Sequence, residues 1–280
     1  MGNQDLLFYE EYEQFYKMAE SSKAFRDFCK NAFGEDFSQD GFSDIAQIDR
    51  ILDFIPSGTD THILDIGCGN GKMLGYLQKK TNDLQKKINA LQKKIQKTNV
   101  FIHGFDYSKA AIEQAKKLFP TKAEFIQGNM GEVDYPKEQF DVITSMDTMY
   151  FAPDMKTFLL QIMDWLKKDG VLFVCYQEGD VMPKTENAET TVLAKALKEC
   201  AIPFTVEDIT KETYALLQKK RETALRYEQA FAAEGNKEWF DLLMIQTDCV
   251  MEGYESFSQQ MARYVYVVRK GTFNLMEKKL

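Results

Sequence analysis

The sequence lacks the features of a membrane protein, a metal-binding protein or a secreted disulfide-rich protein. Its cysteines form no Cys-x-x-Cys pair and have no metal-ligand spacing. The first residues lack the basic region and apolar run of a secretory signal, and no apolar stretch approaches the ~20 residues that span a bilayer. We therefore expect a soluble, cytoplasmic protein with reduced thiols, no bound metal and no membrane partner. The cysteines are Cys29, Cys68, Cys175, Cys200 and Cys249.

Positive charge is concentrated in one segment of an otherwise acidic chain. Residues 77–99 contain seven lysines and one aspartate, a net of +6 within a chain total of −8, so the remainder carries −14. An acidic body repels a phosphate backbone. Nucleic acid is therefore a poor candidate partner, whereas a neutral or cationic small molecule is favoured.

The same segment contains a tandem heptad at 77–97, in which Leu84, Ile88, Leu91 and Ile95 alternate at spacings of four and three. This spacing predicts a long amphipathic helical extension. Two interpretations stay open, because three heptads are at or below the length that indicates a coiled coil. The helix either mediates homodimerisation or binding of another partner, or it is a solvated insertion produced by local duplication.

From residue 61 onward, predicted strands and helices alternate, which is typical of a parallel sheet with crossover helices. The last predicted strand is the densest in β-forming residues. The sequence therefore predicts an α/β fold. The predicted strands are 62–66, 100–105, 123–127, 140–145, 170–176, 204–209 and 262–269.

Helical patterns flank the predicted sheet. Residues 5–55 carry apolar side chains at helical spacing, with a stop at Gly34 and a third helix that Ser43 or Asp44 caps and Pro56 ends. We expect these helices to lie on or over the predicted sheet. The predicted domains are an N-terminal helical cap (1–57) and a main domain (58–280), which includes the heptad insertion (77–99) and a helical lid or brace (210–258) with helices at about 212–233 and 237–257.

The most informative motif is a glycine-rich turn after the first predicted strand, which runs from Asp65 through three alternating glycines to Gly71. Glycine adopts positive φ readily and leaves room for a ligand against the backbone. A dinucleotide fingerprint beginning at Gly67 would need glycine at position 72, and a phosphate-binding loop ending at Gly71 would need glycine at position 66. Those positions hold Lys72 and Ile66, which excludes both motifs.

The remaining pattern, Asp65-x-Gly67-x-Gly69-x-Gly71, resembles motif I of the class I methyltransferases that depend on S-adenosylmethionine (SAM). A nucleoside on such a fold needs an acidic residue at the end of the second strand to accept hydrogen bonds from the ribose, and Asp106 stands there. It follows Gly71 by 35 residues instead of about 20, and the heptads account for the excess.

This resemblance implies a fold and a cofactor. The fold is a Rossmann-like, seven-stranded, mostly parallel sheet with helices on both faces, the last two strands being antiparallel. The cofactor is SAM, and its product is S-adenosylhomocysteine. The segment from Gln39 to Asp44 also resembles the cap that precedes motif I in uncharacterised bacterial members of this superfamily.

The resemblance also implies roles for side chains that follow the later strands. Asn129, where family members often have aspartate, would accept a hydrogen bond from the adenine amino group, and the Met130 amide would reach a ring nitrogen. Met146 and Asp147 would line the methionine end, although Asp147 is equally interpretable as a helix cap. Tyr150 would face the transferred methyl group and position the reactants. The predicted cofactor-binding residues are Asp65, Gly67, Cys68, Gly69, Gly71, Asp106, Tyr107, Asn129, Met130 and Met146.

Methyl transfer from a sulfonium mainly requires that both reactants are held in line, and such positioning supplies up to ~7 to 11 kcal/mol. An oxygen acceptor normally also needs a base or a metal to remove its proton. The two histidines, His62 and His103, fall in predicted core strands, where we expect structural roles. We therefore predict methylation of nitrogen in a small molecule whose cation contacts aromatic rings. The predicted substrate-contacting residues are Tyr12, Tyr16, Phe42, Asp147 and Tyr150.

Two other functions stay open. One is an O- or carboxyl-methyltransferase of a small metabolite, and the other is a SAM-binding regulator or scaffold whose heptad helix recruits a partner. The Asn/Asp-Pro-Pro-aromatic loop used for amino groups of nucleic-acid bases is absent, since 145–148 reads Ser-Met-Asp-Thr. Motif I and Asp106 predict SAM binding in every case, so turnover is the property that separates them.

Overall fold

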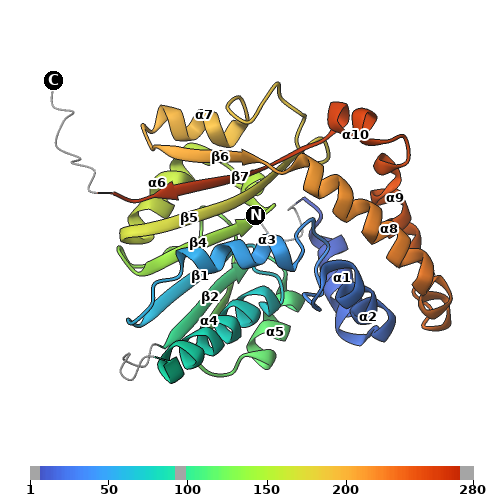
Figure 1. Cartoon of the computed structure of the whole chain (residues 1–280), viewed down its shortest axis with the longest axis horizontal. Helices are drawn as coiled ribbons and strands as arrows, with labels where there is room; N and C mark the ends of the chain where they lie inside the picture. The colour runs from blue at the N-terminus through green and yellow to red at the C-terminus, as the bar shows by residue number, and fades with distance from the viewer. Residues whose placement is uncertain (1–6, 92–98, 272–280) are drawn as a thin grey trace.

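Seven strands form the sheet at the centre of the molecule (Figure 1). The computed structural model describes residues 7–91 and 99–271. The strands are β1 (Thr61–Ile66), β2 (Val100–Asp106), β3 (Ala123–Gln127), β4 (Phe140–Met146), β5 (Leu166–Glu178), β6 (Phe204–Asp208) and β7 (Ala262–Arg269). Their order is β3-β2-β1-β4-β5-β7-β6, and β7 alone runs antiparallel to its neighbours β5 and β6. The predicted seven-stranded, Rossmann-like sheet is confirmed.

Helices cover both faces of the sheet. They are α3 (Ile45–Asp49), α4 (Lys72–Leu91) and α5 (Lys109–Leu118) on one face, and α6 (Met155–Trp165) and α7 (Val192–Glu199) on the other. Successive side chains of β1 alternate between these faces, so Ile63 packs in the cluster with α4 and α5, whereas Leu64 and Ile66 pack in the cluster with α6 and α7. Burial on both faces is the property of a parallel sheet.

β5 is longer than the strand predicted at 170–176. It begins at Leu166, which pairs with Phe140 before the register between β4 and β5 shifts. Within this irregular stretch Asp169 has a φ of 64°, and its amide donates a hydrogen bond to the carbonyl of Lys270. Because the irregular backbone keeps its partners on both sides, the strand continues through it.

The N-terminal helices are α1 (Tyr9–Ser21), α2 (Lys23–Phe33), α3 and the 3₁₀ helix η2 (Arg50–Phe54). Ser22 caps α2 by accepting a hydrogen bond from the amide of Phe25 at 3.0 Å. α2 ends at Gly34, whose φ of 86° suits the left-handed position after a helix. Asp44 caps α3 by accepting from the amides of two residues in its first turn. The stop at Gly34 and the cap at Asp44 therefore lie where the sequence signals predict them, whereas the cap at Ser22 was not predicted.

α1 and α2 pack against a helical hairpin formed by α8 (Thr210–Ala233) and α9 (Lys237–Gln246), beside which they lie in Figure 1, whereas α3 lies on the sheet. Phe28 of α2 meets Phe231 of α8 with ring centroids 6.3 Å apart. Glu234 accepts hydrogen bonds from the Ser22 hydroxyl and the Ala24 amide. The cap at 1–57 thus shares its apolar cluster with the hairpin, and its division from 58–280 stays a prediction.

The continuous helix predicted at 237–257 is wrong. It is divided into α9, a 3₁₀ turn η4 (Asp248–Val250) and α10 (Tyr254–Gln260). The Thr247 hydroxyl donates to the carbonyl of Leu243 at 2.8 Å. Gly253 has a φ of 91°, which a helix cannot contain. Local backbone hydrogen bonding and one glycine therefore override the apolar periodicity.

Helix α4 continues into the heptad segment as far as Leu91. Its first part packs on the body, where Thr81 is buried, whereas Leu84 is 45% exposed. The seam position Ile95 lies outside the described residues, and the structure does not describe the side chains of Ile88 and Leu91. Dimerisation or partner binding through 77–97 therefore stays a prediction.

Candidate functional site

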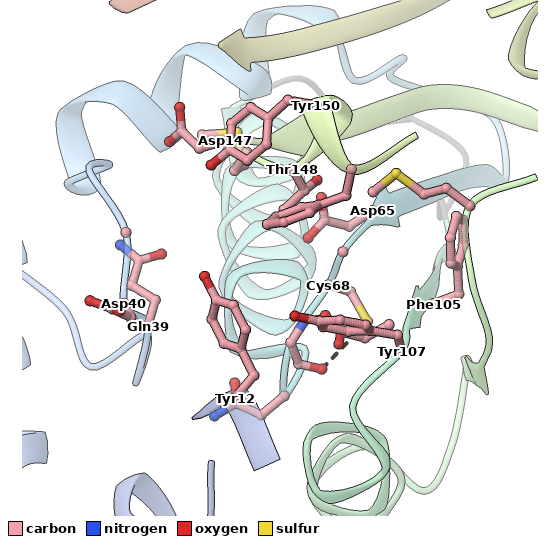
Figure 2. A pocket seen from close by; sticks show the side chains of 18 of the residues that line it. Tyr12, Gln39, Asp40, Asp65, Cys68, Phe105, Tyr107, Asp147, Thr148 and Tyr150 are labelled. Carbon is pink, nitrogen blue, oxygen red and sulfur yellow. Dashed lines mark hydrogen bonds between the residues drawn. The ribbon is translucent and has the colours of Figure 1, made fainter. Parts of the chain in front are cut away.

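A cavity of about 500 Å³ lies where β1, β2 and β4 end (Figure 2). Its size falls in the range of small-molecule sites, and the carboxyl ends of parallel strands are where such folds bind ligands. The walls come from these strand ends, α1, the loop at 37–42 and the segment after β5. The predicted site residues that line it are Tyr12, Tyr16, Phe42, Asp65, Gly67, Cys68, Gly69, Asp106, Tyr107, Asn129, Met130, Met146, Asp147 and Tyr150.

Gly71, predicted to bind the cofactor, has a different environment. It has a φ of 74°, and a Cβ placed on it would lie 2.7 Å from the ring of Phe125 in β3. Its lack of a side chain therefore allows the start of α4 to pack on the sheet. It is not among the described residues that line the cavity.

Asp106, the last residue of β2, is a buried carboxylate of the cavity that two backbone amides orient. One oxygen accepts from the amide of Gly69 and the other from the amide of Ser108, both at 2.9 Å. Burial raises its pKa to about 6. Each carboxylate oxygen has a further lone pair, so this side chain can accept hydrogen bonds from two hydroxyls of a ligand.

Asp65 is a second buried carboxyl at the glycine turn. The Thr144 hydroxyl donates to it at 2.7 Å, which links the ends of β1 and β4. Burial raises its pKa to about 7, because the surroundings disfavour the ionised form. At neutral pH this group therefore exists in both protonation states.

Tyr16 of α1 covers the glycine turn. Its hydroxyl lies so close to Gly69 that a Cβ on this glycine would be 2.3 Å from it. Burial, with Asp106 nearby, raises the pKa of the Tyr16 phenol well above its usual value. Tyr16 therefore lies at the end of the cavity with Asp106 and Gly69, and not at the end with Tyr150.

Asn129 provides an observation that bears on the cofactor directly. Its amide nitrogen donates to Glu132 at 2.7 Å, whereas its side-chain oxygen is buried and has no hydrogen-bond partner among the described residues. A buried acceptor without a partner costs free energy. An adenine amino group is a donor that would satisfy it, so the residues present fit the nucleoside that the resemblance implies.

Tyr12 and Tyr150 face each other across the other end of the cavity, with Gln39 and Asp40 to one side (Figure 2). Burial raises the pKa of both phenols well above the usual value. Both hydroxyls therefore stay protonated near neutral pH and are available as hydrogen-bond donors.

Asp147 lies beside Tyr150 but already has a partner. Arg263 of β7 donates to its two oxygens at 2.9 and 2.6 Å, and the guanidinium is fully buried. The same guanidinium donates to Ser43 and Gln47, which precede and lie within α3. Asp147 is therefore neither a helix cap nor a free carboxylate. The sequence signal for Arg263 is a lone charge at the start of the densest β-forming strand.

Three further carboxylates, Asp40, Glu132 and Asp180, line the cavity and were not predicted. Asp40 accepts from Gln246 of α9 at 2.9 Å, and the buried Lys220 ammonium of α8 lies 3.6 Å from its other oxygen. Asp180 is exposed to solvent, and partial desolvation, with Asp40 nearby, raises its pKa. These residues lie in loops without periodicity; the resemblance at 39–44 covers Asp40 but does not indicate that its side chain enters the cavity.

The histidines lie within the sheet. His62 is at the amino end of β1, opposite the cavity; its Nδ1 lies 3.1 Å from Nε2 of His103, and Nδ1 of His103 lies 3.2 Å from Glu124. Burial lowers the pKa of both imidazoles. Among the described residues, no group of three or more His, Cys, Asp or Glu is arranged to hold a metal ion.

Comparison with known proteins identifies the family. Residues 57–229, more than half of the chain, match the family model described as a methyltransferase domain. Sterol 24-C-methyltransferase ERG6B of Gibberella zeae is 25% identical over 148 residues, which are 52% of this chain and 35% of that protein. Phthiotriol/phenolphthiotriol dimycocerosates methyltransferase of Mycobacterium tuberculosis is 21% identical over 196 residues, 69% of this chain and 65% of that protein. The chain therefore spans less than two thirds of either relative.

A solved structure shows the same fold. Phosphoethanolamine N-methyltransferase 2 of Haemonchus contortus, in complex with S-adenosyl-L-methionine, has a TM-score of 0.69 at 17% identity, covering 95% of this chain and 60% of that one. Within residues 7–91 and 99–271, no helix has the length and apolar character needed to cross a bilayer. From its family match, its sheet and its glycine turn, the chain belongs to the class I SAM-dependent methyltransferases.

Proposed function

We propose that the protein transfers the methyl group of SAM to a nitrogen atom of a small amine. The observation that supports this best is the charge of the cavity. Its described lining contains six acidic side chains and one lysine, Lys72, which is itself paired with Asp36 at 2.8 Å. The acidic lining residues are Asp40, Asp65, Asp106, Glu132, Asp147 and Asp180. Arg263 neutralises Asp147, and the Lys220 ammonium lies 3.6 Å from Asp40, so the negative charge of the lining rests mainly on Asp106, Glu132 and Asp180. Such a lining favours a cationic acceptor over an anionic one.

The cofactor end of the proposal assigns Asp106 to the ribose hydroxyls, Asn129 to the adenine amino group and Met146 to the methionine end. SAM supplies an electrophilic methyl group. Asp106→Ala removes two hydrogen-bond acceptors of a charged group, so the free energy of SAM binding should weaken by about 1.5 to 3 kcal/mol. Titration calorimetry with SAM measures this loss. An affinity equal to that of the unaltered protein would contradict the assignment of Asp106.

At the acceptor end, the aromatic rings of Tyr12 and Tyr150 are suited to contact an ammonium group. An amine must be neutral to attack the methyl carbon, so a proton has to leave it. Asp180 is the proposed proton acceptor, because it lines the cavity and is exposed to solvent, to which the proton can pass, and partial desolvation raises its pKa above the usual value. Asp147 is less suited, since Arg263 occupies both of its oxygens.

The test is methyl transfer from labelled SAM to libraries of amines, carboxylates and phenols. We expect turnover of amines, and Asp180→Asn should lower kcat about 100-fold, the lower limit for loss of a general base. The matched control is Asp241→Asn, which removes the same charge from the exposed face of α9 and should leave kcat unchanged. Turnover of carboxylates or phenols alone would contradict nitrogen as the acceptor.

SAM binding without turnover in any library would favour the non-catalytic regulator or scaffold.

A cytoplasmic location is also part of this proposal. Its support is that all five cysteines carry free thiols, three of them buried, as expected in a reducing compartment.

A further inference from the structure

Helix α1 carries a buried carboxylate, Glu13, that the proposed function does not use. Only 8% of its surface is exposed. Its Oε1 accepts hydrogen bonds from the Ser108 hydroxyl at 2.7 Å and from the Ala110 amide at 3.0 Å. A buried carboxylate needs such partners. Both are in the first turn of α5, so one side chain of α1 is fixed at the start of another helix.

The amino end of α5 is a favourable place for this charge. Its free amides carry partial positive charge, and Ser108 already caps the helix by accepting from the Ala111 amide at 3.1 Å. Glu13 accepts a hydrogen bond from the preceding amide, that of Ala110, and another from the hydroxyl of the capping residue Ser108. Glu13 therefore acts as a second cap that is supplied by a distant part of the chain.

The same helix contacts both groups that orient Asp106. The Ser108 amide donates to one oxygen of Asp106, while the Ser108 hydroxyl is held by Glu13. The Gly69 amide donates to the other oxygen, and Gly69 is covered by Tyr16 of α1. The position of α1 and the orientation of Asp106 are thus linked through two residues.

α1 is also a wall of the cavity itself. Tyr12 and Tyr16 line it, and Tyr12 packs beside Tyr107 with ring centroids 6.0 Å apart. We propose that Glu13 is a positioning residue that seats α1 against the cofactor end of the cavity, so that SAM affinity depends on a carboxylate outside the proposed cofactor contacts. This inference rests on the proposed assignment of Asp106 to the ribose. It concerns the affinity for the cofactor and not the identity of the methyl acceptor.

The experiment compares three variants by calorimetry with S-adenosylhomocysteine. Glu13→Ala removes both hydrogen bonds, and the dissociation constant should rise about five- to tenfold, the equivalent of a lost helix cap. Glu13→Gln keeps an oxygen that can accept both bonds and should restore most of the affinity. The matched control is Glu20→Ala, which breaks an α1–α5 ion pair with Lys117 at the surface and should change affinity less than twofold.

Hydrogen exchange at the amides of 9–21 separates seating of α1 from general loss of stability. S-adenosylhomocysteine should slow exchange of α1 in the unaltered protein, and Glu13→Ala should reduce this protection. The inference is overturned if Glu13→Ala binds within twofold of the unaltered protein, or if Glu20→Ala weakens binding equally.

Further variants keep the inference testable if Glu13→Ala does not fold. Gln114→Leu cuts the other buried anchor of α1, the hydrogen bond from Gln114 to the Tyr16 carbonyl at 2.6 Å. It should weaken binding in the same direction, and unchanged affinity would overturn the inference. Asp106→Ala distinguishes the two proposals: unaltered binding would reject the ribose assignment, whereas weak binding beside an unaffected Glu13→Ala would reject the role of Glu13 alone.

Discussion

Replacement of Arg263 by methionine should destabilise the protein strongly, because it leaves the buried carboxylate of Asp147 without its partner. The guanidinium is fully buried and donates to Asp147, Ser43 and Gln47. Removing one partner of a buried ion pair costs about 3 to 5 kcal/mol, because the remaining charge stays desolvated. That is a large share of a typical stability of about 5 to 15 kcal/mol.

The size of the loss can be assigned by a second substitution. Asp147 has a φ of 59°, which asparagine also tolerates, so Asp147→Asn removes the charge without straining the backbone. The double variant Arg263→Met with Asp147→Asn should therefore be more stable than Arg263→Met alone by about 1 to 3 kcal/mol. Arg50→Met is the control, since Arg50 pairs with Glu207 at the surface and should cost less than about 1 kcal/mol.

Urea unfolding followed by circular dichroism gives the free energy of unfolding of each variant. If Arg263→Met costs no more than Arg50→Met, the buried pair contributes no more than an exposed one. If the double variant is as unstable as Arg263→Met, the loss comes from packing of the arginine and not from the orphaned carboxylate. Either result would refute the electrostatic reasoning.

Three further outcomes follow from the cavity and from α4. Asp65→Asn should raise the thermal midpoint of unfolding at pH 8, because the folded-state pKa of about 7 means that the ionised carboxylate destabilises the folded protein there. This gain should vanish as the pH falls toward 3.8, the pKa of the same group in the unfolded chain. SAM affinity should fall below pH 6, where Asp106 becomes protonated, and calorimetry between pH 5 and 8 tests this. Replacing 84–97 by a short glycine linker should preserve SAM affinity, since Leu84 is 45% exposed. Replacing 79–97 also deletes the buried Thr81 and should lower the thermal midpoint.

Elements whose local chemistry agrees with their packing could be predicted from the sequence. The buried strand that ends at Ile66, the helix stop at Gly34 and the cap at Asp44 each depend on neighbours in the sequence. The same holds for Asp106, because its place at the end of β2 follows from the order of strands. Hydrophobic spacing also gave one wrong prediction. The helix predicted at 237–257 is interrupted at Gly253, whose positive φ this spacing does not indicate.

Side chains that meet only through tertiary packing could not be predicted. Arg263 reaches Asp147 across 116 positions, and Asp40 reaches Gln246 across 206. Gln246 has no local pattern that distinguishes it from a surface residue, and neither the position of Arg263 at the start of β7 nor the resemblance at 39–44 indicates which residue is the partner. The acceptor end of the cavity is built from such contacts, whereas the cofactor end is built from residues next to strand ends. This difference explains why the motif predicts the cofactor, whereas the proposed acceptor depends on the charge of the cavity lining.

The glycine turn itself combines binding with packing. Gly67 lies against Thr148, Gly69 against the Tyr16 hydroxyl and Gly71 against Phe125, and a Cβ at each would come within 3.0 Å of its neighbour. Two of these glycines line the cavity, and the third allows α4 to approach β3. Alanine at Gly71 should therefore lower stability through the clash with Phe125, whereas alanine at Gly69 should also displace α1 and weaken SAM binding. The three glycines of the motif are therefore needed both for the packing of α1 and α4 against the turn and for the binding of a ligand there.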